Sequence, residues 1–295
     1  MPPLPSRDEF PRRYGPEDEI GAANEITADT VLRAASLITH GSRYNLGQIL
    51  EPTSPTQSWR YWRTTPNLER LVPGHGVGIN QLTGLEENIA GSSHSGTHLD
   101  GLGHIGIGES AYNGYRYADI INGDGLTRLG IETVPPFVTR GVVLDIAALV
   151  GETMLDAERT ITAADLEGAA ERQGVIVGPG DALLIHTGWG RLWTADGHRY
   201  VSTEPGIGLE AAAWCTDRRV SLIGADNWAV EVVTSEATSI FPVHQHCIAR
   251  FGCYLLENVR TDELVRDGVH EFCFTVMPIR SKGASGSPVA PLAIA

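Results

Sequence analysis

The sequence predicts a mixed α/β protein, because short apolar runs bounded by turn residues alternate with helical patterns that begin at threonine and end at glycine. At 295 residues, 42% of them hydrophobic, the chain is long enough to bury a substantial core. No proline- or serine-rich linker interrupts its middle. We therefore expect a single domain over residues 1–295, with an N-terminal arm over 1–25 and a C-terminal tail over 283–295.

The helices are predicted from their end signals. Thr27 can cap a helix that stops at Gly41, and Thr162 can cap one that stops at Gly174. A third helix is expected within Glu204–Arg219. Strands are expected where short apolar runs lie between turn residues, at Arg43–Ile49, Gly141–Ile146, Ala182–Thr187, Val220–Ala225, Cys253–Glu257 and Phe272–Pro278.

The charge and composition exclude several classes of partner. The net charge is −14 and no lysine or arginine cluster is present, which argues against nucleic acid and anionic membranes and favours a small-molecule partner. No basic start followed by an apolar run is visible, and no stretch approaches the ~20 apolar residues of a membrane span, so we expect a cytoplasmic protein. The cysteines lie scattered in apolar segments, which indicates reduced, buried thiols.

Four side chains that can bind a divalent metal or move a proton lie close together in the sequence: His94, His98, Asp100 and His104. A helix would separate Asp100 from the histidines, and the glycines nearby make a helix costly. In an extended chain their even spacing points all four the same way. Imidazole and carboxylate suit Zn²⁺, Mn²⁺ or Fe²⁺. The stretch therefore predicts a metal site, with a hydrogen-bonded polar loop as the alternative.

The motif His94-x-Gly-Thr-His98-x-Asp100-x-x-x-His104 resembles the signature of the cyclase-type metal-dependent hydrolases, which include kynurenine formamidases, isatin hydrolases and a trans-dienelactone hydrolase. Later segments resemble the same family: Phe241-Pro-Val-His-Gln-His246, Gly252, Leu256-Glu-Asn258 and Gly283-Ala-Ser-Gly-Ser-Pro288. The likeness covers nearly the whole chain. Many members have proline where this chain has Leu102, a departure that bears on the loop leading to His104.

The resemblance implies a swivelling β/β/α fold with a mixed, β-rich core, a homodimer or homotetramer, and one or two divalent ions per chain, Zn or Mn. It implies that His104 is the catalytic acid/base and that Glu257 belongs to both the catalytic groups and the ligands. The metal ligands that it implies are His94, His98, Asp100, His244 and Glu257.

The choice between His244 and His246 as ligand stays open at this stage. If the chain is extended there, both side chains face the same way and Gln245 points oppositely. His246 is then either the alternative ligand or an outer partner of the site.

A divalent ion with an open position lowers the pKa of bound water to about 7 and polarises a carbonyl, and His104 can pass a proton to the leaving group. We therefore expect a hydrolase that opens a small cyclic ester or amide (a lactone, lactam or imide) or cleaves an aryl formamide. Asp226 is a pocket candidate because it follows an apolar strand, where loops often build sites. The aromatic pocket candidates, for which core or subunit contact is the alternative, are Trp59, Trp62, Tyr112 and Trp189.

Two other functions remain open. His98, Asp100 and His244 also match the two-histidine, one-carboxylate site of a non-haem Fe(II) oxygenase. That interpretation leaves His94, His104 and Glu257 without roles. The second alternative is a metal-containing protein that binds a small molecule and has lost its hydrolytic activity. The presence of His104 and Glu257 argues against such a loss.

Overall fold

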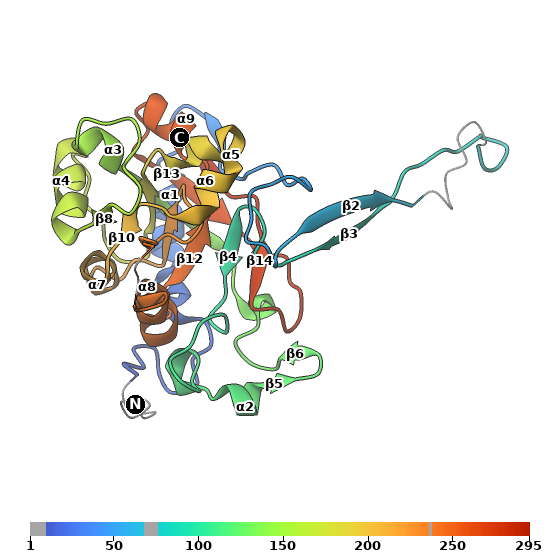
Figure 1. Cartoon of the computed structure of the whole chain (residues 1–295), viewed down its shortest axis with the longest axis horizontal. Helices are drawn as coiled ribbons and strands as arrows, with labels where there is room; N and C mark the ends of the chain where they lie inside the picture. Colours follow the sequence, from blue (N-terminus) through green and yellow to red (C-terminus); the bar gives the residue numbers. More distant parts are fainter. Residues whose placement is uncertain (1–9, 68–75, 236–237) are drawn as a thin grey trace.

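The computed structural model describes residues 10–67, 76–235 and 238–295. A nine-stranded mixed sheet runs through the body of the molecule (Figure 1), in the order β1-β15-β13-β7-β9-β11-β12-β4-β14. The predicted mixed α/β class is confirmed. The strands of this sheet are β1 (Arg43–Asn45), β4 (His98–Asp100), β7 (Phe137–Asp145), β9 (Ala182–His186), β11 (Leu222–Ala225), β12 (Tyr254–Glu257), β13 (Glu271–Val276), β14 (Gly286–Pro288) and β15 (Leu292–Ile294).

The centre of the sheet is parallel. β7, β9, β11 and β12 run in one direction, and the strands on either side of them pair antiparallel. Every residue of β9, β11 and β12 is buried. Strands covered on both faces are apolar almost throughout, which is why the apolar runs predicted them. All six predicted strands are confirmed, with shifts at their ends.

The helix predicted from Thr162 is confirmed. α4 (Ala163–Gln173) begins with a capping box, in which the Thr162 side chain accepts from the Asp165 backbone and the Asp165 side chain accepts from the Thr162 backbone. It ends at Gly174, whose φ of 69° is left-handed and favours glycine.

The helix predicted from Thr27 starts as expected but ends early. α1 (Ala28–Ala35) stops well before Gly41, and Leu32 is 69% exposed. Thr30 and Ala34 are the buried positions, because α1 packs against β7 through small side chains rather than through its large apolar ones. The predicted end of this helix was therefore wrong.

The third predicted helix is shorter than expected. α7 (Leu209–Asp217) begins after Gly208, because residues 206–207 form β10 (Gly206–Ile207), which pairs with β8 (Thr160–Ile161). No helix of the described segments has both the length and the apolar character of a membrane span. The other short elements are η2 (Gly21–Glu25), η4 (Tyr112–Gly114), α2 (Tyr117–Ile120), β5 (Ile121–Asn122), β6 (Gly125–Leu126), η5 (Ile131–Thr133), α3 (Ile146–Leu149), η6 (Trp189–Arg191), α5 (Leu192–Ala195), α6 (Gly197–Ser202), α8 (Pro242–His244), the π-helix η7 (Gln245–Arg250) and α9 (Asp262–Arg266).

Both ends of the described chain are built into the body. Residues 1–9 of the expected N-terminal arm lie outside the described residues, whereas Phe10 is buried and Asp18 accepts a hydrogen bond from the Tyr112 hydroxyl. The expected C-terminal tail supplies β14 and β15. Because β14 pairs with β4, the last residues of the chain support the strand that carries His98 and Asp100.

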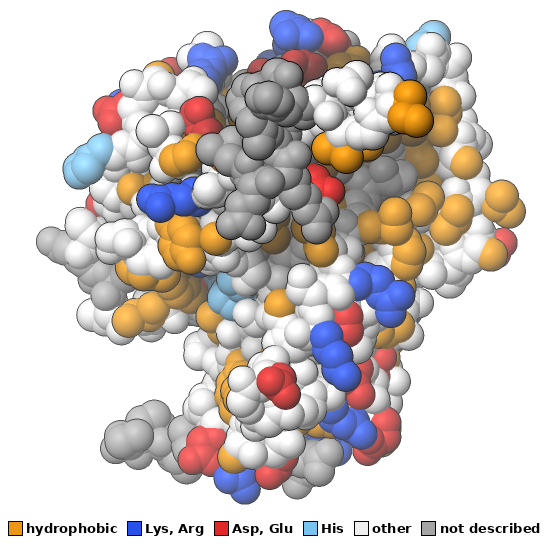
Figure 2. All heavy atoms as spheres, turned by 90° about the vertical axis from the view of Figure 1, so that its right-hand side faces the viewer, with side chains coloured by type: hydrophobic (Ala, Val, Ile, Leu, Met, Phe, Trp, Pro, Cys, Tyr) orange, Lys and Arg blue, Asp and Glu red, His pale blue; other side chains and the backbone are white. Residues whose placement is uncertain are grey.

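A hairpin of β2 (Trp62–Pro66) and β3 (Glu87–Gly91) projects from the body (Figure 1). The two strands pack mainly against each other. Figure 2 views the molecule from this side, and hydrophobic side chains gather around the hairpin. The exposed large apolar side chains of the hairpin and its base are Trp59, Tyr61, Val77, Ile79, Leu82, Leu85 and Ile89.

Removing the capping box should destabilise α4. We expect Thr162→Ala to lower the free energy of unfolding by about 1 kcal/mol, since backbone N–H groups at the start of the helix lose their acceptor. Urea unfolding followed by circular dichroism measures this change. Thr153→Ala, at an exposed threonine with no side-chain hydrogen bond among the described residues, is the control, and equal losses in both variants would contradict the role of the cap.

Candidate metal centre

Strand pairing brings three of the candidate ligands together. His98 and Asp100 are two residues apart on β4, so their side chains share a face. β4 pairs antiparallel with β12, and Glu257 lies directly opposite His98. Residues opposite one another in a sheet also share a face. Ligand atoms of His98, Asp100 and Glu257 consequently lie within 4.8 Å of one another, and all three residues are buried.

The rest of the 94–104 stretch is not extended, which corrects the expectation for this window. Gly96 has a φ of +60°, and a Cβ there would overlap the side chain of Leu50, so this turn requires glycine. A second turn closes where the His104 N–H donates to the Gly101 carbonyl at 3.0 Å. These two turns, rather than strand periodicity, bring His94 and His104 to Asp100.

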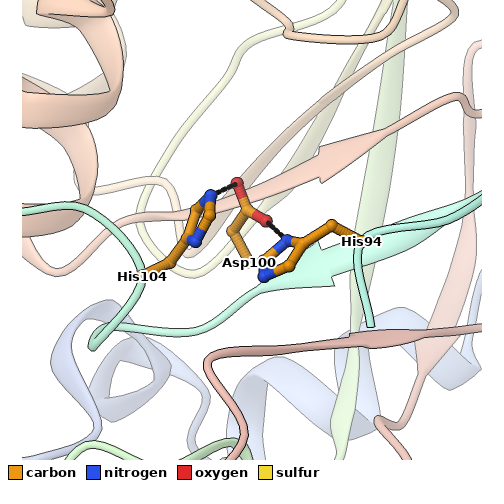
Figure 3. Close-up of side chains that lie close together, drawn as sticks. All are labelled: His94, Asp100 and His104. Atoms are coloured by element: carbon orange, nitrogen blue, oxygen red, sulfur yellow. Dashed lines mark hydrogen bonds and ion pairs between the residues drawn. The ribbon is translucent and has the colours of Figure 1, made fainter. Parts of the chain in front are cut away.

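Asp100 contacts two imidazoles, those of His94 and His104, which stack on each other (Figure 3). Its Oδ1 is 2.8 Å from His94 Nδ1, and its Oδ2 is 3.9 Å from His104 Nε2. The centroids of the two rings are 3.9 Å apart. His94 Nε2 is also engaged, at 3.1 Å from the Ser285 hydroxyl. His94, Asp100 and His104 thus form a second group of possible ligands that shares Asp100 with the first.

His244 reaches the same place from a helix. Its Nε2 lies 3.2 Å from Glu257 Oε1 and 3.6 Å from Asp100 Oδ2. The chain here is helical, from α8 into η7, and not extended, so the condition under which His244 and His246 would face the same way is not met. His246 therefore points elsewhere: its Nε2 is 2.9 Å from the Thr216 hydroxyl and its ring packs on Phe251. The structure places His244 with the candidate ligands, and not His246.

The hydrogen bonds around His98 leave room for a cation. His98 Nδ1 lies 2.8 Å from the Gly96 carbonyl, which can only accept, so the proton is on Nδ1 and Nε2 presents a lone pair. That lone pair faces Glu257 Oε2 at 3.0 Å and Asp100 Oδ1 at 3.6 Å. Among the described residues, no hydrogen-bond partner is found for three buried atoms: His98 Nε2, Asp100 Oδ2 and Glu257 Oε2. Acceptors that face one another in a buried site require a second proton or a metal ion between them.

The His244 ring is oriented in the same way as that of His98, by a contact to its Nδ1. Its Nδ1 lies 2.5 Å from Glu231 Oε1, and Glu231 also accepts from the backbone N–H groups of His244 and Val243. This contact holds the proton on Nδ1 and turns Nε2 toward Asp100 and Glu257. Glu231 was not predicted to belong to the site. It lies thirteen residues before His244 and in no motif, so only the tertiary contact reveals it.

The pKa values of the cluster also indicate that its carboxylates need a balancing positive charge. Burial lowers the pKa of His104 to about 4 against the opposing charge of Asp100, so this ring is neutral at pH 7. Burial opposes charge on His244, but the hydrogen bonds to Glu231 and Glu257 raise its pKa to about 10. Burial also opposes ionisation of Glu257, yet His98 and His244 lower its pKa to about 2. Extra protons on the imidazoles balance the carboxylates, and a divalent ion would replace those protons.

The candidate pocket residues do not gather around this cluster. Tyr112 and Trp189 are core side chains instead: the Tyr112 hydroxyl donates to Asp18 and Trp189 Nε1 donates to the Tyr200 carbonyl. Sequence periodicity cannot separate a core aromatic from a pocket aromatic, because both are apolar and semi-regularly spaced.

The other candidates occupy different surroundings. Trp59 is 73% exposed and Trp62 lies on β2, both at the base of the hairpin. Asp226 is buried and faces a separate cavity, where it accepts hydrogen bonds from the loop after β9. The small cavity beside His94 is lined instead by Pro55, Thr56, Gln57, Arg60, Gly96, Val201, Trp228 and Asn258.

This fold and this cluster of imidazoles and carboxylates define a cyclase-type protein, and comparison with known families agrees. Residues 42–232 match the family described as "Putative cyclase", and the chain belongs to this cyclase family. The resemblance drawn from the sequence motifs is confirmed. No curated protein matches the chain.

Solved structures share the fold. The chain is 31% identical in sequence to a protein whose crystal structure is described as that of a novel cyclase. The TM-score is 0.88, and the match covers 99% of this chain and 100% of that one. It is 21% identical to isatin hydrolase A from Ralstonia solanacearum, with a TM-score of 0.61 and 91% and 97% coverage. It is 15% identical to an isatin hydrolase bound to the product analogue thioisatinate, with a TM-score of 0.66 and 92% and 99% coverage. The expected cyclase-like fold is thereby confirmed.

Removal of Asp100 should empty the centre, because this carboxylate belongs to both groups of possible ligands. We expect Asp100→Ala to lose most of its bound metal, measured per chain by elemental analysis. Asp119→Ala, at an exposed carboxylate outside the cluster, is the control and should keep its metal. Full metal content in Asp100→Ala would exclude Asp100 as a ligand.

Glu231 should act through His244. We expect Glu231→Gln to weaken metal affinity about 10- to 100-fold, since the amide no longer holds the His244 proton on Nδ1 with a negative charge. Competition with a chromogenic chelator measures the affinity. Glu210→Gln, at an exposed glutamate in α7, is the matched control, and equal affinities in the two variants would contradict this role.

Proposed function

We propose that this chain is a metal-dependent hydrolase that opens a small cyclic ester or amide (a lactone, lactam or imide) or cleaves an aryl formamide. The observation that carries this proposal is the set of buried acceptor atoms of His98, Asp100 and Glu257, which face one another and have no hydrogen-bond partner in the part of the chain that the structure describes. Solved relatives described as isatin hydrolases and as a predicted metal-dependent hydrolase support the same class of reaction.

His98, Asp100, His244 and Glu257 would hold a divalent ion, Zn or Mn, and His94 beside Asp100 allows a second ion that shares this carboxylate. When bound, such an ion would polarise the carbonyl of the substrate and would activate a water molecule at neutral pH. The imidazoles are held in the required tautomer by the Gly96 carbonyl and by Glu231, so the ligand atoms are oriented in advance.

His104 is suited to move the proton. Its side chain is 20% exposed, whereas those of His98 and His244 are almost fully buried, so His104 faces the accessible side of the cluster. It is neutral at pH 7 because burial lowers its pKa, and a neutral imidazole can accept a proton and pass it to a leaving group. Stacking on His94 fixes the orientation of its ring.

The cluster fits a non-haem Fe(II) oxygenase less well. That class of site uses two histidines and one carboxylate, with open positions for oxygen and substrate. Here a second carboxylate, Glu257, lies 3.0 Å from His98 Nε2 and 3.2 Å from His244 Nε2. Both carboxylates converge on the same two imidazoles, which favours hydrolysis.

The base of the hairpin adjoins the candidate centre. Arg60 donates from its guanidinium to the His94 carbonyl at 3.0 Å, and the Ser95 hydroxyl donates to the Tyr61 carbonyl at 3.2 Å. Trp59 and Trp62 flank these residues, so we retain both as candidates for substrate contact. Contact with either indole would suit a flat or aromatic substrate.

The proposed activity is tested by an anaerobic screen of lactones, isatin-like lactams and aryl formamides on metal-loaded protein. We expect turnover without O₂, and we expect His104→Ala to keep its metal while kcat falls ~10²- to 10⁴-fold. His198→Ala, at an exposed histidine, is the control. Turnover that requires O₂ would refute hydrolysis, and metal loss with residual activity in His104→Ala would refute its role as acid/base.

We also propose that the chain forms a homodimer or homotetramer in which a second copy covers the exposed hairpin. Light scattering should give a multiple of the chain mass, and Leu82→Ser with Ile89→Ser should shift the protein toward monomer because both side chains are more than half exposed. Ile176→Ser removes an equally exposed side chain far from the hairpin in the sequence and should have no effect. A monomeric wild-type protein would refute this assembly.

A further inference from the structure

A second cavity, of about 680 Å³, is lined by none of the candidate metal ligands. It lies where the parallel strands β9, β11 and β12 end, and His186, Asp226 and residues 259–262 line it. In open α/β sheets the crevice outside the carboxyl ends of the strands is the usual place for a ligand. A volume of this size is typical of a small-molecule site.

The strand register separates this cavity from the metal cluster. Glu257 shares a face with Leu255, which pairs with Ile223, and Ile223 in turn pairs with Leu183. Leu183 is three residues before His186, so these two side chains point to opposite faces of the sheet. His186 consequently projects away from the face that carries Glu257.

His186 is held with one ring nitrogen free. Its Nδ1 lies 2.7 Å from the Thr261 hydroxyl and 3.4 Å from Asp226 Oδ2. The Asp226 carboxylate is fixed by the backbone N–H groups of Thr187 and Gly188. Asp226 favours the proton on Nδ1, which leaves the Nε2 lone pair without a hydrogen-bond partner among the described residues. His186 lines the cavity, so a ligand bound there can donate a hydrogen bond to Nε2.

Both signs of charge surround the cavity. Arg260 and Arg266 line it but already pair with Glu263 and Asp267. Arg191, Glu51 and Asp262 also line it, and within the described ranges their side chains form no hydrogen bond or ion pair. A ligand with only a negative charge could pair with Arg191 but not with the two acidic side chains, and a ligand with only a positive charge could do only the reverse.

We propose that this cavity binds a small amino acid in its zwitterionic form. The carboxylate pairs with Arg191, and the ammonium group donates to His186 Nε2 and faces Glu51 and Asp262. Both charges of the ligand are then matched, and the lone pair of the buried imidazole receives a donor. This site is independent of the metal cluster and of the proposed hydrolysis.

The proposal is tested on the metal-loaded, full-length protein by thermal unfolding with each standard amino acid and with 4-aminobutyrate at millimolar concentration. At least one should raise Tm, because a ligand that binds only the folded state stabilises it. Calorimetric titration should then show that analogues of that amino acid lacking the amine or the carboxylate bind about tenfold more weakly or worse. No rise in Tm, or equal binding of an analogue with one charge, would overturn the proposal.

Variants locate the binding. Arg191→Ala and His186→Gln should each raise Kd about tenfold, whereas Arg33→Ala, at an exposed arginine of α1, should leave Kd unchanged. Asp100→Ala should also bind normally, because Asp100 belongs to the metal cluster. Loss of binding in Asp100→Ala, or unchanged binding in Arg191→Ala, would overturn the assignment. Arg191 is exposed, so its variant decides the matter even if His186→Gln does not fold.

Discussion

The buried carboxylate of Asp100 is the group on which the candidate centre depends. Imidazoles surround it, and no described residue forms a hydrogen bond with its Oδ2 although Asp100 is fully buried. An ionised carboxylate in such a place is costly unless positive charge balances it. The four histidines around it (His94, His98, His104 and His244) and Glu257 are therefore arranged around a point where a cation is required, and the pairing of β4 with β12 creates that point.

Distant segments of the chain orient the groups of this centre. The turn at Gly96 supplies a carbonyl to His98, the segment after β11 supplies Glu231 to His244, and the C-terminal segment supplies Ser285 to His94. Each partner engages one ring nitrogen and so decides where the other points. Contacts from distant segments thus set the direction of the ligand atoms, whereas strand pairing in the sheet brings these atoms close together.

The parallel strands present polar groups on both faces of the sheet. The end of β12 carries Glu257 toward the metal cluster, and the end of β9 carries His186 toward the larger cavity. In both places an imidazole has one nitrogen engaged and the other directed into open space or toward unpaired acceptors. Side-chain alternation along strands is enough to keep the two sites apart.

The sequence alone determined the α/β class, the central strands and the N-cap of α4, and it singled out the candidate ligands, because these follow from local apolar patterns, end signals and side-chain chemistry. Only the tertiary structure decided that His244 and not His246 lies beside Asp100, since helical rather than extended backbone turns residues two apart away from each other. It also revealed Glu231, and it placed Tyr112 in the core. Such choices depend on which distant segments pack together, and no local pattern encodes that packing.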